Sequence, residues 1–305
     1  MRRGLKFLII SIFSIVMLCG CGNKFLGTQA NKEESEISSE ITVWKEVNNF
    51  KEADRTLNDD NYLTEKNEAI EEDTEETEEV DLITINSEDV RIPILMYHSI
   101  SDENPENNLM VPPAMFEEQM AWLEENGFTA MDLDQAVEAM ETGVVPEKPV
   151  VITFDDGYMD NYTSAFPILK KHNLKATFFV ITDGVDDGYY MSSDMLKEMQ
   201  SEGMVIENHT ANHLELNSLS REDAYDSIKR GQDYLRDTIG ASGNYLCYPV
   251  GRYSDETIEI CKELGIKASV TTEAGISSSA DGIYQLKRIR ISPMDISSFA
   301  SIFSE

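Results

Sequence analysis

The stretch KPVVITFDDGYMDNY, residues 148–162, joins a run of β-branched and aromatic residues to two aspartates and a glycine. A continuous apolar run bounded by turn residues predicts a strand that is covered on both faces of its sheet. Asp155 and Asp156 stand at its end, where two neighbouring carboxylates repel each other and resist desolvation. One interpretation is turn chemistry, with Gly157 supplying a conformation that other residues avoid. The alternative is a functional carboxylate pair.

Strand-like and helix-like segments alternate from residue 91 onward. The strand-like segments are residues 91–100, 149–157, 175–181, 204–210, 244–251, 266–272 and 284–291. The helix-like segments are residues 113–127, 161–173, 192–203, 220–240 and 255–265, and a short amphipathic tail follows. This alternation is typical of βα units and a mainly parallel sheet, and about seven such units favour a closed (β/α) barrel. Chemistry in such barrels gathers at the C-terminal ends of the strands, where Asp155 and Asp156 would lie.

The N-terminal segment, residues 1–20, has a basic start and then an apolar run that is typical of a secretory signal. The run is short for a spanning helix, and an uncleaved membrane anchor is the alternative. It ends in Leu18, Cys19, Gly20 and Cys21, which resembles the lipobox of bacterial lipoproteins. That resemblance implies a lipid on Cys21 and a chain tethered to the outer face of the bacterial cell membrane.

Residues 21–88 are rich in acids and poor in aromatic residues, as in EAIEEDTEETEEVD at 68–81. Such a segment cannot bury enough apolar surface to offset its ordering entropy, so we predict a disordered acidic linker. The formal charge of −32 argues against nucleic acid as a partner. Residues 89–305 suit one folded domain, in which Cys247 and Cys261 are expected as buried free thiols, with a single bridge as the alternative.

The second informative stretch is VIENHTANHLEL, residues 205–216. His209 and His213 follow a predicted strand, and a helical turn would let both imidazoles face one point. Two of only four histidines lie within these five residues, although closely spaced surface histidines also occur. Two histidines and one carboxylate form an open catalytic site for a divalent metal such as Zn²⁺. One aspartate would then be neutralised by the metal, and the other would stay free as a base.

Three motifs now carry a family resemblance: TFDDGY (153–158), HTANH (209–213) and YPVGRYS (248–254). In this order and separation they resemble the motifs of the polysaccharide deacetylases, carbohydrate esterase family 4. The resemblance runs over residues 92–291 and includes MYHSI, PILKKHNLKATFFVI and LKRIRI. It implies a distorted, incomplete (β/α) barrel and a divalent metal, Zn²⁺ first, with Co²⁺ or Ni²⁺ as alternatives.

Residue by residue, the resemblance implies that Asp156, His209 and His213 are the metal ligands. It implies that Asp155 is the general base that deprotonates the attacking water.

The same resemblance implies that the backbone N–H of Val250 stabilises the tetrahedral oxyanion. Tyr158 and Tyr248 are candidates for the sugar groove, with ordinary packing as the alternative.

The chain departs from the family pattern in the residue that would act as general acid. Many members protonate the leaving amine with a histidine in a late Leu-x-His segment, and this chain has no histidine after His213. His98, at the end of the first predicted strand, is the candidate replacement. The arrangement resembles the branch that acts on poly-β-1,6-N-acetylglucosamine, in which an early histidine has this role. A structural histidine is the alternative.

Two further departures concern the residues around the base. Cys247 stands where many members have an arginine that orients the base. Arg288 or Arg290 from the last strand is expected to supply that charge, with an ordinary surface ion pair as the alternative. Val250 stands where an aromatic residue is usual, so a sugar-stacking surface is expected to be lost.

The expected function is metal-dependent removal of acetyl groups from N-acetylglucosamine residues of a cell-surface polysaccharide, with poly-β-1,6-N-acetylglucosamine as first choice. Peptidoglycan and acetylated xylan are alternative substrates. The hypothesis from another class is an inactive carbohydrate-binding protein that keeps the barrel as a scaffold.

Overall fold

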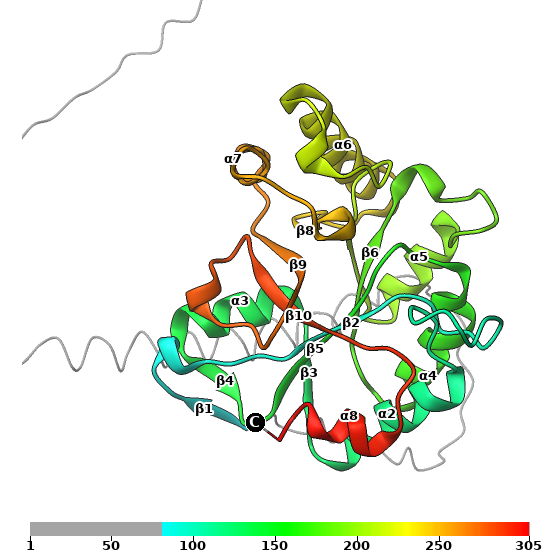
Figure 1. Cartoon of the computed structure of the whole chain (residues 1–305), viewed down its shortest axis with the longest axis vertical. Helices are drawn as coiled ribbons and strands as arrows, with labels where there is room; N and C mark the ends of the chain where they lie inside the picture. Colours follow the sequence, from blue (N-terminus) through cyan, green and yellow to red (C-terminus); the bar gives the residue numbers. More distant parts are fainter. Residues whose placement is uncertain (1–80, 305) are drawn as a thin grey trace, which may run out of the picture. The chain divides into compact units, whose positions relative to one another are not determined.

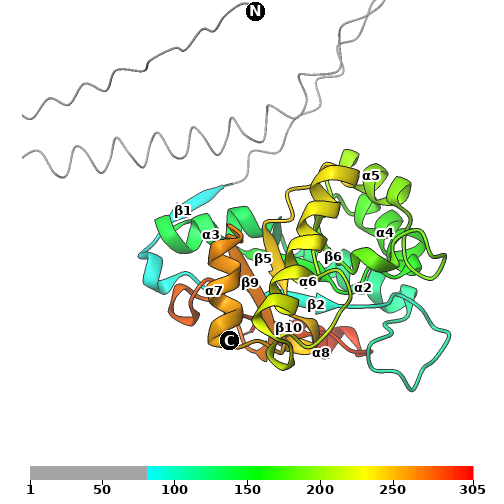
Figure 2. The same cartoon turned by 90° about the horizontal axis from the view of Figure 1, so that it is seen from above.

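The computed structural model describes residues 81–304 (Figures 1 and 2). The predicted signal (1–20), the lipidation site Cys21 and most of the predicted linker lie outside these residues. The predicted linker boundary is wrong at its C-terminal end, because β1 (Leu82–Thr84) pairs antiparallel with β4 (Val144–Pro146). The pairing satisfies backbone groups that a disordered segment would leave to water. Within residues 81–304, no helix combines the length and the apolar character that crossing a membrane requires.

Seven parallel strands form the centre of the domain. They are β2 (Ile94–Tyr97), β5 (Pro149–Phe154), β6 (Thr177–Val180), β7 (Val205–Asn208), β8 (Tyr245–Cys247), β9 (Ala268–Ala274) and β10 (Leu286–Arg290). The hydrogen-bonded order is β2-β10-β9-β8-β7-β6-β5, and pairing of β2 with β5 closes the ring. The prediction of a (β/α) barrel with about seven units is therefore confirmed. The ring is distorted where the register between β9 and β10 shifts at Leu286 and Arg288.

Helices follow most of the strands. They are α2 (Pro113–Glu125), α3 (Leu133–Thr142), α4 (Phe166–Lys171), α5 (Ser193–Ser201), α6 (Arg221–Tyr234), α7 (Asp255–Glu263) and α8 (Ile296–Ser301). Both views show α2, α4 and α5 side by side against the strands. The expected helix at 220–240 is α6 continued by a π-helical turn, Leu235–Ile239, and it ends at Gly240 in the left-handed conformation.

Sequence patterns missed the region between α2 and β5. There β3 (Thr129–Met131) pairs with the first half of β5, and α3 follows directly. A capping box between Asp132 and Gln135 starts α3. This Asp-x-x-Gln pattern, followed by apolar residues at helical spacing, was available in the sequence as a signal.

Alternating side chains divide each ring strand into an outward and an inward row. Outward residues such as Leu95 and Ile152 share a buried cluster with Phe116 of α2. Inward residues such as Val151 and Phe179 belong to a second cluster. Because Asp155 lies four residues beyond Val151, its side chain continues the inward row at the C-terminal end of β5.

The inward row of β7 contains Glu207, which pairs in register with Phe179 and is 2% exposed. Its carboxyl accepts hydrogen bonds from the Ser242 hydroxyl (2.9 Å) and the Tyr245 backbone N–H (3.0 Å). Burial raises the pKa of Glu207 to about 8, although both hydrogen bonds oppose the shift. The folded protein therefore keeps Glu207 protonated at neutral pH.

The free energy of unfolding should consequently fall as the pH rises. Above the ordinary glutamate pKa of 4.5 the unfolded chain loses the proton that the folded chain retains until about pH 8. Within this window the titration of Glu207 should lower the free energy of unfolding by at most about 1.4 kcal/mol per pH unit. Urea denaturation at pH 5 and pH 8 measures the fall. Glu207→Gln should reduce it because an amide does not titrate, and the amide can still pair with Ser242 and Tyr245. An identical pH dependence in the variant would contradict the assignment.

Candidate active site

The predicted site residues converge on one end of the barrel. Asp155 and Asp156 follow β5, His98 follows β2, and His209 follows β7. Arg288 lies in β10. Because all these strands are parallel, their C-terminal ends meet at the same mouth, where barrel enzymes carry their chemistry.

Asp156, His209 and His213 form a compact group. Each offers one possible ligand atom, and these atoms lie within 4.8 Å of one another. The Asp156 Oδ1 atom is 3.3 Å from the His209 Nε2 atom and 3.4 Å from the His213 Nε2 atom. Charged hydrogen bonds are shorter, about 2.7–2.9 Å. Two ligands that each lie about 2.0–2.1 Å from a tetrahedral Zn²⁺ stand about 3.3–3.4 Å apart, so this donor set fits such an ion.

The backbone around His209 fixes the direction of its ring. The Nδ1 atom lies 2.8 Å from the Cys247 carbonyl oxygen, which can only accept, so Nδ1 carries the proton. With Nδ1 used in this way, Nε2 is the ring nitrogen that faces Asp156, which is the orientation that metal-binding histidines need.

The expected helical turn between the two histidines is wrong. Residues 209–213 are irregular, with left-handed φ angles of 64° at Thr210 and 54° at His213. A hydrogen bond from the His213 N–H to the Thr210 Oγ1 atom holds the bend. The two imidazoles still converge, with centroids 4.8 Å apart. Asp156 also has a left-handed φ, 74°, and such strain in non-glycine residues is typical of functional sites.

Asp155 forms a bidentate ion pair with Arg288, which is 0% exposed. The Nη1 and Nη2 atoms of Arg288 donate to the two carboxylate oxygens at 2.7 Å each. Burial would raise the pKa of Asp155, but the charge and hydrogen bonds of Arg288 outweigh it and hold this pKa well below its usual range. Arg290, the alternative partner, is exposed.

The other donors of Arg288 are also used. Its Nε–H donates to the Thr271 carbonyl oxygen at 2.8 Å, Nη1 to the Thr153 Oγ1 atom at 3.0 Å, and Nη2 to the Cys247 Sγ atom at 3.2 Å. All five N–H groups of the guanidinium therefore have partners.

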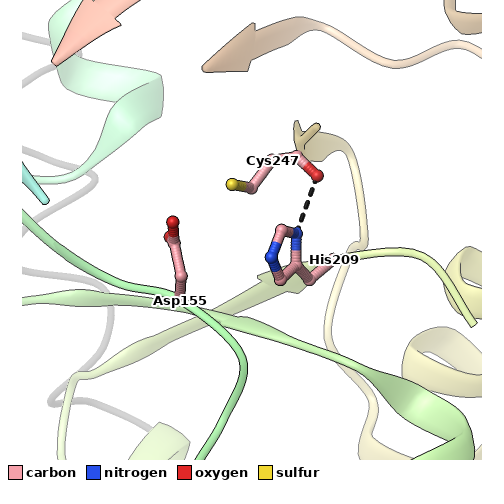
Figure 3. A group of neighbouring side chains, drawn as sticks. All are labelled: Asp155, His209 and Cys247. Atoms are coloured by element: carbon pink, nitrogen blue, oxygen red, sulfur yellow. Dashed lines mark hydrogen bonds between the residues drawn. The ribbon is translucent and has the colours of Figure 1, made fainter. Parts of the chain in front are cut away.

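Cys247 lies in a second group that could hold a metal, together with Asp155 and His209 (Figure 3). Figure 3 shows the three side chains pointing toward one another. Arg288 donates to both Asp155 and Cys247, so a fixed positive charge already occupies this group and disfavours a cation. Burial also raises the pKa of the Cys247 thiol. Both Cys247 and Cys261 are free and buried, as expected.

His98 lies next to the ion pair. Its Nε2 atom is 3.8 Å from the Asp155 Oδ2 atom, and its side chain is 11% exposed. Burial lowers the pKa of His98, and the charges of Asp155 and Asp156 only partly oppose this. Within residues 81–304, its Nδ1 atom is buried without a hydrogen-bond partner.

Two residues that sequence reasoning missed hold the loop of His98. The Asn161 Nδ2–H donates to the His98 carbonyl oxygen at 2.7 Å. The Asp160 carboxylate accepts from the Ser99 hydroxyl at 2.5 Å and from the Ile100 N–H at 3.0 Å. Both belong to the MDNY end of the opening stretch, where two polar residues at a helix start were the available signal.

The substrate-groove candidates have different positions. Val250 has a left-handed φ of 49° and a side chain 51% exposed, in the loop that follows β8. Tyr158 is half-buried and stacks on Tyr190. Tyr248 is corrected to packing: it is 0% exposed and stacks on Tyr253 at 4.5 Å, because its side chain joins the outward row of the barrel.

Comparison with known proteins adds three relatives. YxkH of Bacillus subtilis, whose name assigns it provisionally to the polysaccharide deacetylases, is 40% identical over 204 residues, 67% of this chain and 72% of its own. The poly-β-1,6-N-acetyl-D-glucosamine N-deacetylase of Staphylococcus epidermidis is 27% identical over 226 residues, 65% of this chain and 78% of its own. The solved deacetylase PplD of Streptococcus pyogenes, in complex with acetate, has 36% identity and a TM-score of 0.68, covering 70% of this chain and 98% of PplD.

The family profile described as polysaccharide deacetylase matches residues 142–269. This range contains Asp155, Asp156, His209 and His213. The similarity to YxkH and PplD extends beyond this range and covers 67% and 70% of the chain. The chain therefore belongs to the polysaccharide deacetylase family, hydrolases that act on amide bonds of polysaccharides.

Proposed function

We propose that the protein is a metal-dependent deacetylase of N-acetylglucosamine residues, with poly-β-1,6-N-acetylglucosamine as its substrate. The observation that carries the proposal is the donor set of Asp156, His209 and His213 immediately beside the Asp155–Arg288 pair. The name of the staphylococcal relative supports the choice of substrate.

Asp156, His209 and His213 would hold the divalent metal, since their donor atoms have the separations that a tetrahedral ion requires. Such an ion polarises the acetamide carbonyl and lowers the pKa of the attacking water.

Asp155 would take the proton from the attacking water. Arg288 keeps it ionised at neutral pH but also makes it a weak base, because its pKa is held low. It therefore suits a water whose pKa has itself been lowered.

His98 would give the proton to the leaving amine. Its lowered pKa makes its protonated form a stronger acid than ordinary imidazolium. The nearby Asp155 carboxylate favours that charged form. The backbone N–H of Val250 would stabilise the developing oxyanion.

We also infer that the enzyme works on the outer face of the bacterial cell membrane, tethered by a lipid on Cys21. The sequence from Leu18 to Cys21 supports this location.

Acetate release from β-1,6-linked N-acetylglucosamine oligomers tests the function. The protein is stripped of metal with a chelator and then resupplied with Zn²⁺ or Co²⁺. Release should disappear on stripping and return on resupply. Release only from peptidoglycan or acetylated xylan would overturn the substrate, and silence on all three would favour the carbohydrate-binding hypothesis.

Asp156→Ala and Asp155→Asn should separate the ligand from the base. Asp156→Ala removes one of the three donors and should weaken the affinity for the metal by at least about tenfold. Asp155→Asn should retain the metal and lose turnover. Elemental analysis after dialysis measures the first effect and acetate release the second. Full metal content in Asp156→Ala would refute the ligand set.

His98→Ala should reduce amide hydrolysis by about 10²- to 10⁴-fold, the range typical of a general acid. An activated aryl acetate should be affected far less, because its leaving group departs without a proton. The ratio of the two rates is the measurement. Equal losses on amide and ester would identify His98 as a structural residue.

A further inference from the structure

Three tyrosines form a cluster beside the metal-ligand group: Tyr158, Tyr189 and Tyr190, hereafter the tyrosine cluster. The rings of Tyr158 and Tyr190 stack in parallel, with centroids 5.6 Å apart and planes 17° apart. The Tyr189 ring stands nearly perpendicular to both, at 88° to Tyr158 and 86° to Tyr190.

The segment that carries the cluster is tied to the catalytic strand end. The backbones of Tyr158 and Tyr190 form an antiparallel bridge. The Met159 N–H donates to the Tyr189 carbonyl at 3.3 Å, and the Met191 N–H to the Gly157 carbonyl at 3.0 Å. The position of the cluster is thus set by the three residues that directly follow Asp156.

The loop is also fixed from its other side. The Asp187 carboxylate accepts from the backbone N–H groups of Tyr189 (2.7 Å) and Tyr190 (3.0 Å). A Cβ at Gly184 would lie 2.4 Å from the Tyr190 ring, so only glycine allows this close packing. These bonds fix the backbone of Tyr189, and its ring is placed by edge contacts with Tyr158 and Tyr190 rather than by its hydroxyl.

Tyr189 is 63% exposed, the highest value among the large exposed hydrophobic residues of the described part of the chain. Two others in that set also adjoin the site: Leu214 follows the ligand His213, and Val250 lies in the loop after β8. Exposed apolar side chains that gather around one site, rather than being scattered singly, are typical of a binding surface.

We propose that Tyr189 is a stacking subsite for the sugar next to the one that is deacetylated. This inference rests on the proposed function. N-acetylglucosamine polymers are uncharged, so an acidic protein cannot hold them by charge. A pyranose ring presents an apolar C–H face, which can pack on an aromatic ring. Binding costs less conformational entropy when that aromatic ring is already held in place before the sugar arrives. The tyrosine cluster offers such a ring one loop away from Asp156.

Tyr189→Ala and Tyr189→Phe test the proposal, with Ile83→Ala as the control. Ile83 is an exposed apolar residue of the separate two-stranded sheet β1–β4, which contributes no residue to the site. Each variant is assayed, with metal supplied, on two substrates: a β-1,6 N-acetylglucosamine pentamer and an aryl acetate. The aryl acetate has no neighbouring sugar, so only its acetyl group needs to enter the site.

Tyr189→Ala should lower kcat/KM on the pentamer by about 5- to 10-fold, mainly through KM, which corresponds to about 1.0–1.4 kcal/mol of stacking. The aryl acetate should change less than about twofold, as should both substrates in Ile83→Ala. Tyr189→Phe keeps the ring and should retain the pentamer activity. Any one of three results would overturn the subsite. Tyr189→Ala could lose equal activity on both substrates, or it could leave the pentamer rate unchanged. Tyr189→Phe could lose as much activity as Tyr189→Ala.

Failure of the proposed function is a separate result. If the wild type releases no acetate from the pentamer, binding of the pentamer is titrated by calorimetry with the wild type and Tyr189→Ala. Weaker binding in Tyr189→Ala would support the subsite, and equal or absent binding would overturn it. A melting temperature within a few degrees of wild type confirms that each variant is folded.

Discussion

The buried ion pair between Asp155 and Arg288 is the interaction on which the mouth of the barrel depends. A guanidinium with no exposed surface must satisfy five donors, and here Thr153, Cys247 and Thr271 complete the set that Asp155 begins. These partners belong to β8, β9 and the end of β5, so one side chain of β10 connects four strands of the ring. Removing one partner of such a buried pair typically costs about 3–5 kcal/mol, because the other charge is left uncompensated.

The same pair determines which partners the two adjacent aspartates have. Arg288 neutralises Asp155, so Asp156 is left as the carboxylate that two imidazoles face. The two adjacent aspartates therefore do not compete for the same counter-charge. This resolves the repulsion that the sequence presents at the end of β5. Arg288 pairs with Asp155, whereas the imidazoles of His209 and His213 face Asp156.

The barrel of about seven units and the rim that carries the candidate site could be predicted because both depend on periodic patterns. Alternating apolar runs and helical stretches are enough to indicate seven βα units, and the ends of parallel strands must share one rim. The direction of single side chains could not be predicted. Tyr248 lies next to Cys247, yet the pleat buries Tyr248 under α7 and turns Cys247 inward toward Arg288. A register shift between β9 and β10 precedes Arg288, and no local signal marks such a shift.

The backbone is left-handed at Asp156, His213 and Val250, and this sets stability against activity at two of these positions. Each such residue costs about 1–2 kcal/mol relative to ordinary helical or extended backbone. Replacement by glycine would relieve that cost, but at Asp156 and His213 it would also delete a side chain that we propose as a metal ligand. Selection for heat resistance and selection for turnover therefore favour different residues at these two positions. Asn173, also left-handed but placed between α4 and β6 at the other end of the strands, carries no such conflict.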